Sequence, residues 1–238
     1  MPILETGTSG YQRIIAGCGA VVCCGILMLA VPRFIASLYA LYPEAAFKQT
    51  QQKLPQEIYE NSIADLNLAL AWYKNPEYWQ KQAFFYLNLL NAVPAPPLEK
   101  KQEILKQAQA SIIQGLKLSP VDPYAWFRLA AVDKLLNAPS PQIINALRLS
   151  IYAGRVEPEL LMSRLSLGYE YYNEFNEEMQ ALWKKQIPVA WTFQPAQLVE
   201  FAALHPEAKH LVEQALVHSP DDLKKFSNDL EILLQKTP

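Results

Sequence analysis

One uncharged stretch near the amino terminus dominates the hydropathy pattern of the chain. Residues 14–31 (IIAGCGAVVCCGILMLAV) contain no Asp, Glu, Lys or Arg, and Arg13 and Arg33 bracket them. As a helix, these 18 residues would rise about 27 Å, close to the roughly 30 Å thickness of a bilayer's hydrocarbon core. Aromatic residues that favour membrane interfaces flank the stretch: Tyr11, Tyr39 and Tyr42. The pattern predicts a single transmembrane helix, with residues 14–35 in contact with the membrane.

The same stretch has other interpretations. A buried core helix is the alternative for a chain without a membrane span. A cleavable signal peptide is disfavoured because no well-formed small-x-small cleavage site follows the stretch. Residues 15–18 (IAGC) resemble a bacterial lipobox, but the apolar residues follow Cys18 instead of preceding it, so we reject a lipoprotein signal. For Cys23 and Cys24, S-palmitoylation stands as an alternative to a small apolar packing role.

The charges around the stretch encode the orientation only weakly. Arg13 and the terminal amine lie on one side, and Arg33, Lys48 and Lys53 lie on the other, which slightly favours a cytoplasmic body. Long domains, however, are translocated largely regardless of their charge, and a short tail before an apolar anchor commonly stays inside. For a bacterial source we favour a periplasmic body anchored in the inner membrane, and a cytoplasmic body stays open.

Beyond residue 55 the pattern changes to a repeated unit. The unit has a small residue, an apolar residue four positions later, a small–apolar pair three positions after that, and a proline four residues beyond the pair. The instances are Ala64-Leu68-Ala71-Trp72-Pro76, Ala108-Ile112-Gly115-Leu116-Pro120, Ala146-Ser150-Ala153-Gly154-Pro158, Trp183-Ile187-Ala190-Trp191-Pro195 and Ala208-Val212-Ala215-Leu216-Pro220. In the third, Ser150 and Gly154 stand at the apolar positions, and in the fourth Trp183 replaces the first small residue. Since the small residues share a helical face and the proline ends the helix, the unit predicts helices that pack closely in pairs.

This unit resembles the second helix of a tetratricopeptide repeat (TPR), and the resemblance covers roughly residues 56–220. It continues into residues that stand where the family has aromatic, leucine and small residues in its first helices: Trp126, Leu129, Ala130, Leu167, Gly168 and Tyr171. The resemblance implies an all-α fold, in which the transmembrane helix is followed by a TPR-like α-solenoid of antiparallel helix pairs. It also implies that Trp126 and Tyr171 lie in the core.

The chain departs from the family pattern in three ways. Its prolines are 44, 38, 37 and 25 residues apart instead of the family's constant spacing of about 34. Pro188 interrupts one second helix, and the first helix after Pro195 is very short. With these departures, the pattern predicts helices at 56–74, 77–92, 98–118, 123–137, 141–153, 159–173, 177–191, 196–204, 206–218 and 221–235, with a stiff loop at 93–97.

We expect three segments along the chain. A short polar tail covers residues 1–10, a transmembrane anchor with its juxtamembrane segment covers 11–42, and a helical repeat domain covers 43–238. The last helix, at about 221–236, is amphipathic and has acidic residues in its first turn, where they complement the helix dipole. It is expected to cap the final apolar face, because end repeats need a polar outer side.

Composition narrows the classes of function. A hydrophobic fraction of 51% with 18% charged residues excludes general disorder. The net charge of −2 gives no reason to expect a nucleic-acid partner. All three cysteines lie in the apolar stretch, so the body can form neither a disulfide framework nor a thiolate zinc site.

No residue pattern supports catalysis. His205 and His210 do not share a helical face, so we expect no metal site. The acidic pairs at 177–178 and 221–222 stand at predicted helix starts, where carboxylates are favourable without any catalytic role. The chain has no glycine-rich phosphate loop, no G-x-S-x-G motif and no Cys/His pairing in its body. We therefore predict that the protein is not an enzyme and uses no cofactor.

The resemblance does imply a binding surface, because the first helices of TPR-like pairs line a concave groove. The family's groove positions fall on Tyr124, Phe127, Ala131 and Lys134 in one repeat and on Met162, Leu165, Tyr169 and Tyr172 in the next. The same stretch holds four arginines: Arg128, Arg148, Arg155 and Arg164. Guanidinium groups beside aromatic rings suit a peptide carboxylate or another anionic group. Our hypothesis is that this groove, with Arg128 and Arg164, binds a protein or peptide partner; ordinary solvated helix surface is the alternative.

The sequence thus predicts a membrane-anchored adaptor or scaffold that supports a cell-envelope assembly, biosynthesis or export complex through its groove. The first alternative is a structural accessory subunit that is buried in a larger membrane complex and has no independent binding groove. An enzyme with an unrecognised helical active site is the second.

Overall fold

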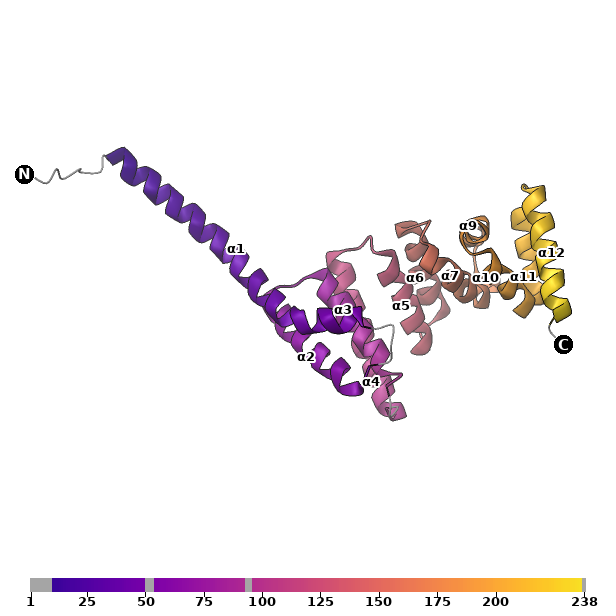
Figure 1. Ribbon diagram of the computed structural model, residues 1–238, viewed down its shortest axis with the longest axis horizontal. Coiled ribbons are helices and arrows are strands. Elements are labelled where there is room, and N and C mark those ends of the chain that lie inside the picture. Colours follow the sequence, from indigo (N-terminus) through magenta and orange to yellow (C-terminus); the bar gives the residue numbers. More distant parts are fainter. Residues whose placement is uncertain (1–9, 50–53, 93–95, 237–238) are drawn as a thin grey trace, which may run out of the picture. The chain divides into compact units, whose positions relative to one another are not determined.

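The chain folds into helices arranged in two compact units. The computed structural model describes residues 10–49, 54–92 and 96–236, and no strand occurs within these ranges. The first unit comprises residues 1–95 and the second comprises residues 96–238 (Figure 1).

The sequence predicted one helical domain over residues 43–238, whereas the structure assigns the first two predicted body helices to a unit that also includes the apolar helix. The reason is that these helices bury their faces against the continuation of that apolar helix. The boundary falls in the proline-rich segment 93–97, most of which lies outside the described residues, as does nearly all of the expected polar tail at 1–10.

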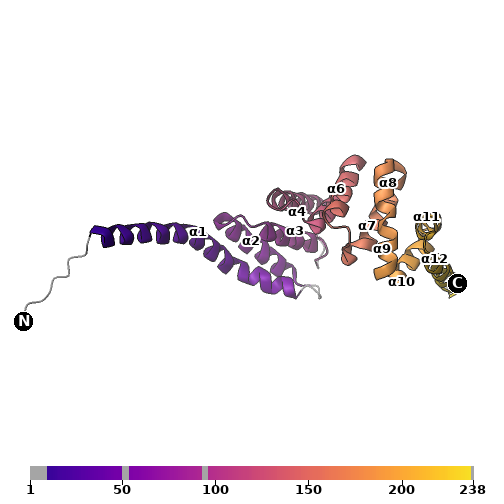
Figure 2. The ribbon, with the colours of Figure 1, turned by 90° about the horizontal axis from the view of Figure 1, so that it is seen from above.

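The first unit contains α1 (Gly10–Lys48), α2 (Gln56–Trp72) and α3 (Pro76–Leu89). The side chains of residues 14–31 on α1 are exposed, whereas the second half of the same helix packs against α2 through Ala36, Ala40 and Ala46. Small side chains at these positions allow the two helices to approach closely. Helix α1 contains Pro32 and Pro43, and it changes direction part-way along its length (Figure 2), as helices commonly do at proline.

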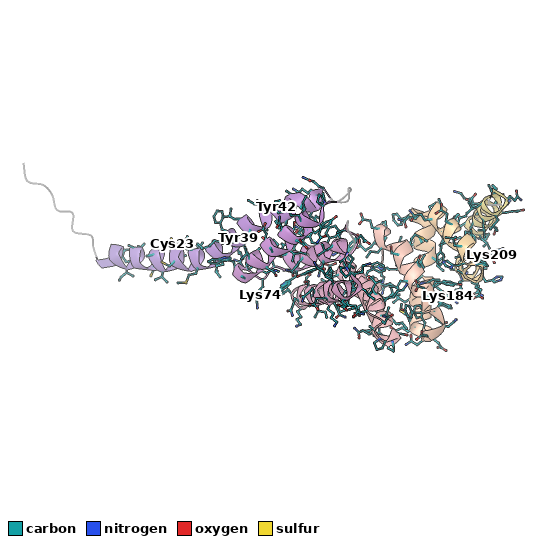
Figure 3. The ribbon with its side chains drawn as sticks, turned by 90° about the horizontal axis from the view of Figure 1, so that it is seen from below. Cys23, Tyr39, Tyr42, Lys74, Lys184 and Lys209 are labelled. Atoms are coloured by element: carbon teal, nitrogen blue, oxygen red, sulfur yellow. The ribbon has the colours of Figure 1, made fainter. Side chains whose placement is uncertain are left out.

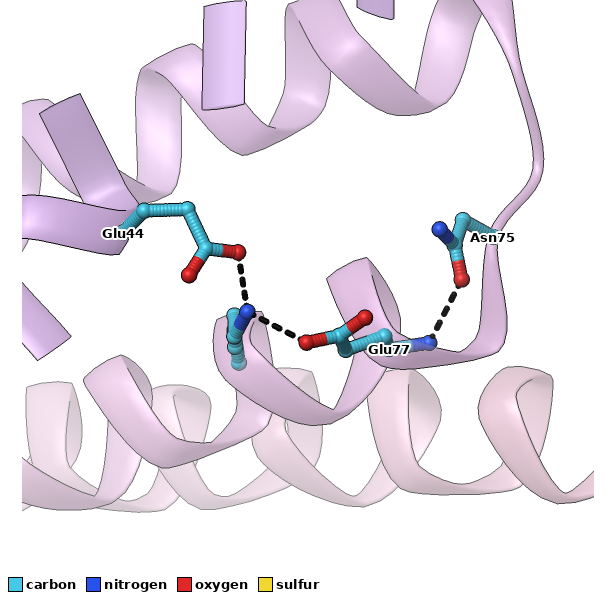
Figure 4. A network of polar contacts seen from close by, with 4 residues as sticks. Glu44, Asn75 and Glu77 are labelled. Atoms are coloured by element: carbon cyan, nitrogen blue, oxygen red, sulfur yellow. Dashed lines mark hydrogen bonds and ion pairs between the residues drawn. The ribbon is translucent and has the colours of Figure 1, made fainter. Parts of the chain in front are cut away.

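An ion-pair network joins the second half of α1 to α3 (Figure 4). The buried Lys81 Nζ donates to the carboxylate of Glu44 on α1 and to Oε1 of Glu77 at 2.6 Å. Burial by itself lowers the pKa of Lys81, but the hydrogen bonds and charges of the two carboxylates outweigh it, so the pKa lies above its ordinary value. Asn75 caps α3 by accepting the Glu77 backbone N–H at 2.9 Å. The carboxyl-terminal half of α1 is therefore part of the folded first unit.

Helix α2 buries the opposite face from the one that the repeat pattern predicted. Its buried side chains include Tyr59, Leu66 and Leu70, which pack toward α1 and α3. Leu68 and Trp72, from the first repeat unit, are instead 48% and 49% exposed. The two sets are offset by two residues, which is about 200° around a helix. The expectation for this unit was wrong because both neighbours of α2 lie on its other side.

The second unit contains α4 (Leu98–Leu118), α5 (Pro123–Leu135), α6 (Ser140–Ala153), α7 (Pro158–Glu170), the short 3₁₀ helix η1 (Tyr172–Glu174), α8 (Glu177–Lys184), α9 (Gln186–Phe193), α10 (Pro195–Leu204), α11 (Pro206–Leu216) and α12 (Pro220–Lys236). The helices pack as successive hairpins, with α5 on α6, α7 on α9, and α10 on α11. Helix α4 packs against α5 at one end of the series, and α12 packs against α10 and α11 at the other. The predicted pairing of helices is thus present in this unit.

The remaining four repeat units are buried largely as predicted. Ala108 and Ile112 of α4, Ile187 and Ala190 of α9, and Ala208 and Val212 of α11 are fully buried at the helix interfaces. Prolines begin α5, α7, α10 and α12, where the missing N–H costs no helical hydrogen bond.

The helix predicted at 177–191 is broken in two. Helix α8 ends at Lys184 and α9 begins at Gln186, with Lys185 between them. The break lies one turn before Pro188, whose nitrogen cannot donate the hydrogen bond that a continuous helix would send back to Lys184. The interruption expected from Pro188 is therefore a division into two short helices.

A close contact of the Trp183 side chain on α8 with the backbone of α7 explains the repeat unit that begins with a tryptophan. Trp183 is fully buried, and its Nε1 donates to the Leu165 carbonyl at 3.3 Å. A Cβ added to Gly168 would lie 2.4 Å from Cδ1 and Nε1 of Trp183, far inside contact distance. Gly168 on α7 therefore leaves the space that the Trp183 side chain on α8 fills.

Helix α12 covers the last hairpin, as predicted for a capping helix. Phe226 and Leu230 are buried against the preceding helices, and the Phe226 ring meets the Trp191 ring edge-on with centroids 5.9 Å apart. Lys225 lies over the same indole, with Nζ 5.9 Å from the ring centroid. The charged face of α12 is left to solvent.

We predict that Lys81→Met lowers the free energy of unfolding of the full-length chain by about 1–3 kcal/mol, because both carboxylates lose their buried cation. Urea unfolding followed by circular dichroism measures the loss. Lys48→Met, at the exposed end of α1, should stay within about 0.5 kcal/mol.

The same substitution carries a pH signature. Since the folded pKa of Lys81 is raised, its stabilisation is complete below the unfolded value of about 10.4 and declines as pH rises beyond it. The difference between the wild type and Lys81→Met should shrink in that range. Equal stability of both lysine variants at neutral pH would contradict the role given to Lys81.

We also predict that Gly168→Ala destabilises the chain by about 1–3 kcal/mol in spite of alanine's higher helix propensity, because the new methyl group overlaps Trp183. Gly19→Ala is the matched control, since a Cβ there meets no atom within 4 Å. In a Trp183→Leu background the penalty at Gly168 should fall, and a double-mutant cycle of thermal unfolding measures this coupling. Additive effects would show that the two side chains do not share the space.

Candidate partner-binding surface

The first helices of the three hairpins lie next to one another. Lys134 Nζ on α5 donates to Glu170 Oε1 at the end of α7 over 2.6 Å. The Tyr169 ring of α7 meets the ring of Phe201 on α10 edge-on, with centroids 5.7 Å apart, and lies 4.8 Å from the ring of His205. Helices α5, α7 and α10 are therefore neighbours. We call the partly exposed side chains Phe127, Lys134, Met162 and Tyr169 on α5 and α7 the first-helix face.

Eight of the ten predicted groove residues are at least partly accessible. They are Tyr124, Phe127, Arg128, Ala131, Lys134, Met162, Tyr169 and Tyr172. The other two, Arg164 and Leu165, are fully buried, so they contact other parts of the fold and not a partner. Each of the cavities described below is lined by other residues of the chain.

Tyr124 and Arg128 are held by their local surroundings at the start of α5. Asp122 caps this helix by accepting the backbone N–H groups of Tyr124 at 2.9 Å and Ala125 at 3.0 Å. The Tyr124 hydroxyl donates to Glu157 Oε2 at 3.1 Å, and burial together with this carboxylate raises the Tyr124 pKa. Burial lowers the pKa of Arg128, and the charge of Asp122 opposes that effect. Both side chains are thus partly buried in the fold.

Three predicted aromatic positions differ from expectation. Helix α7 ends before Tyr172, which lies in η1 with its ring 5.2 Å from the ring of Trp183, so it packs toward α8. Trp126 and Tyr171 were expected in the core but are only partly buried. The Trp126 Nε1 donates to the Pro120 carbonyl at 2.8 Å, which places the indole against the loop before α5, and Tyr171 stands where α7 ends.

Arg164 occupies the interior between α6 and α7. Its Nε donates to Ser150 Oγ at 3.0 Å and its Nη2 to the Ser150 carbonyl at 2.6 Å. Its Nη1 donates to the Gly154 carbonyl at 2.7 Å and reaches Gln186 Oε1 at 3.5 Å. Our assignment of Arg164 to the groove was wrong, because its guanidinium binds the carbonyl groups at the end of α6 and not a partner.

This buried arginine accounts for the third repeat unit, which matched the family pattern poorly. Ser150 and Gly154 stand where apolar residues were expected; Ser150 accepts from Arg164 with its hydroxyl and carbonyl, and Gly154 accepts with its carbonyl. A cation at this position also complements the negative end of the α6 dipole. Burial lowers the pKa of Arg164 to about 10, so the group remains charged at neutral pH. At this interface the chain has a polar contact where the family pattern has an apolar one.

The structure also separates the four arginines that the sequence places in one stretch. Arg128 lies on α5 and Arg164 in the core, whereas Arg148 and Arg155 belong to α6 and the segment after it. Arg148 lies 3.8 Å from Glu178 on α8, between Nη1 and Oε2. The four side chains therefore do not form one anion-binding cluster.

A cavity between α6, α8 and α9 was not expected. It has a volume of about 350 Å³ and is lined by Tyr152, Arg155, Val156, Glu178, Ala181, Leu182, Lys185, Gln186 and Val189. The Tyr152 hydroxyl donates to Glu178 Oε1 at 2.5 Å across one wall. We call this site the second-helix cavity. Leu182 and Val189 are seven residues apart, and neither belongs to the face that the repeat pattern predicted to be packed. This second pair of apolar residues was the sequence signal for the cavity.

Two further cavities lie elsewhere in the second unit. One of about 290 Å³ involves Ile144 and Arg148 of α6 together with Met179 of α8. The other, of about 320 Å³, lies between α10 and α12 and involves Val199, Lys225 and Ile232. Among the described residues, no group of three or more His, Cys, Asp or Glu side chains is arranged to hold a metal ion.

We predict that Arg164→Ala lowers the free energy of unfolding by about 3–5 kcal/mol, because buried carbonyl groups lose their charged donor. Arg155→Ala is the matched control, since this side chain is exposed and its loss should cost no more than about 0.5 kcal/mol. Urea unfolding of the full-length chain measures both. Similarly small losses of unfolding free energy in Arg164→Ala and Arg155→Ala would contradict a structural role for Arg164.

Comparisons with known proteins support the fold alone. No protein-family model matches the sequence, and no curated protein matches it. Among solved structures, the crystal structure of the MamA protein aligns with a TM-score of 0.54 at 13% identity, covering 86% of this chain and 96% of that one. A second crystal structure of MamA aligns with a TM-score of 0.49 at 14% identity, over 75% of this chain and 92% of that one. MamA is a TPR-like helical solenoid, so this chain has an all-α, TPR-like fold.

Proposed function

We propose that the protein is a single-pass, membrane-anchored scaffold that holds a protein partner on its TPR-like body. The observation that carries the proposal is the exposure of apolar side chains along the first half of α1. Met28, for example, is 77% exposed, and none of the most apolar window of this helix is buried. A helix in the core of a protein buries such residues against neighbours, so the buried-core interpretation is disfavoured.

The continuity of α1 favours a retained anchor over a removed signal peptide. The helix continues from the apolar stretch into the segment that packs on α2 through Ala36 and Ala40 and pairs with α3 through Glu44. Removing the apolar stretch by cleavage near its end would cut this helix just before its packed half. We infer that residues 14–35 span the membrane and that, for a bacterial source, the body lies in the periplasm.

The first-helix face is the surface that we propose for the partner. It exposes parts of Phe127, Met162 and Tyr169, the kind of aromatic and methionine side chains that are enriched at protein interfaces. The Lys134–Glu170 pair on this face is partly exposed, so opening it for an acidic partner group costs little. A protein or peptide segment with apolar side chains and an anionic group fits this surface. The partner complex would act in envelope assembly, biosynthesis or export.

The test uses a photo-crosslinking amino acid in the full-length protein in native membranes. At Met162 it should capture a discrete protein, and at Ala181 of the second-helix cavity it should not. Phe127→Ala should weaken recovery of that protein about tenfold or more, since truncating an interface aromatic commonly costs about 2 kcal/mol. Ala181→Trp, which fills the cavity, should leave recovery unchanged.

The opposite pattern, with capture at Ala181 and sensitivity to Ala181→Trp alone, would transfer the partner site to the second-helix cavity. Capture at both positions, together with aggregation of a fragment that begins at residue 32 and so keeps the packed half of α1, would favour the structural accessory subunit instead. A topology reporter fused after residue 238 identifies the compartment of the body.

A further inference from the structure

The end of α2 lies beside the point where α1 leaves its apolar stretch. The guanidinium carbon of Arg33 is 4.9 Å from the centroid of the Tyr73 ring, directly after the last residue of α2. Arg33 follows residue 31 by two positions, which is about 3 Å along a helix. Figure 3 shows Cys23 on the projecting half of α1 and Lys74 near the base of that half. If residues 14–31 fill the hydrocarbon core, Tyr73 therefore lies at its edge.

The side chains at this corner have the chemistry of a membrane interface. Trp72 is half exposed, Tyr73 is partly exposed, and Lys74 is exposed. Trp and Tyr concentrate where hydrocarbon meets headgroups, because their rings are apolar while their N–H and O–H groups remain solvated. Lys74 and Arg33 add two cations that anionic phosphate groups attract.

The exposed stripe of α2 extends the same surface. Leu68 lies one turn before Trp72 on the same side of the helix, and both are exposed although the sequence predicted that they pack against a neighbour. Tyr39 and Tyr42, the interfacial aromatics expected from the sequence, lie about 12 Å and 16 Å beyond residue 31 along α1. Tyr73, which contacts Arg33, and its neighbour Trp72 add aromatic rings from α2 on the same side of the apolar stretch.

We propose that the corner formed by Trp72, Tyr73 and Lys74 is a second membrane contact, which inserts into the headgroup layer of the bilayer that α1 crosses. This inference rests on the proposed membrane span. The occupant of the exposed stripe is a phospholipid surface, since the Tyr73 ring next to Trp72 lies against Arg33, two residues beyond the apolar stretch of α1. Together with the span, the corner would attach the first unit to the membrane at two points. Two attachments restrict how the unit tilts relative to the bilayer.

The experiment reconstitutes the full-length protein in phosphatidylcholine–phosphatidylglycerol vesicles that contain lipids brominated near the top of the acyl chain. Bromine should quench part of the tryptophan fluorescence, and Trp72→Phe should remove the larger part of that quenching. Trp126→Phe is the matched control, because Trp126 is a partly exposed tryptophan of the second unit, and it should leave the quenching almost unchanged. Persistence of the quenching in Trp72→Phe would overturn the inference.

Two further readouts separate the ways in which the proposal can fail. A membrane-impermeant maleimide should not label Cys23 in intact vesicles and should label it once detergent is added; labelling without detergent would refute the span itself. Protected Cys23 with no bromine quenching of Trp72 would refute only the corner contact. Chemical crosslinking of two copies through position 72 would show that protein, not lipid, covers the stripe, and would also overturn the inference.

Discussion

Close approach between the paired helices is the constraint on which the second unit depends. The Trp183 ring of α8 can lie against the backbone of α7 only because Gly168 has no side chain there. Between α6 and α7, the small side chain of Ser150 lies beside the guanidinium of Arg164 and accepts a hydrogen bond from it. Each interface thus matches a large group on one helix with a small residue on its neighbour, as dense packing requires. A buried Asp133 that accepts hydrogen bonds from Gln109 and Gln142 provides a third, polar link, from α5 to α4 and α6.

The first unit depends on a different arrangement, in which one long helix serves two environments. The exposed half of α1 carries an uninterrupted apolar surface, and the packed half uses alanines against α2 and Glu44 against Lys81 on α3. Because the two halves belong to one helix, the position of the apolar half constrains the position of the packed half. Tyr73, next to Trp72, lies against Arg33, close to where the two halves meet. Anchoring and folding are therefore coupled through the same element in the proposed function.

In the proposed function, the second unit has two candidate surfaces for a partner. The first-helix face is made by side chains that the TPR resemblance identified. It has aromatic and methionine side chains beside a partly exposed ion pair. The second-helix cavity combines apolar walls with Arg155, Lys185 and Glu178. Arg148 and Arg155 lie apart from Arg128. An anionic partner would therefore meet different cations on each surface.

Much of this architecture follows from local sequence signals. Apolar spacing and the prolines determine where most helices begin and end, because a helix face and a helix stop are properties of a few consecutive residues. The apolar stretch, the hairpin order and the capping role of α12 were predictable for that reason. Tertiary structure decided which face each helix buries: α2 exposes the stripe of Leu68 and Trp72, and α7 turns Arg164 inward. Those outcomes depend on the neighbours that a helix meets, and the periodicity of a single segment does not contain that information.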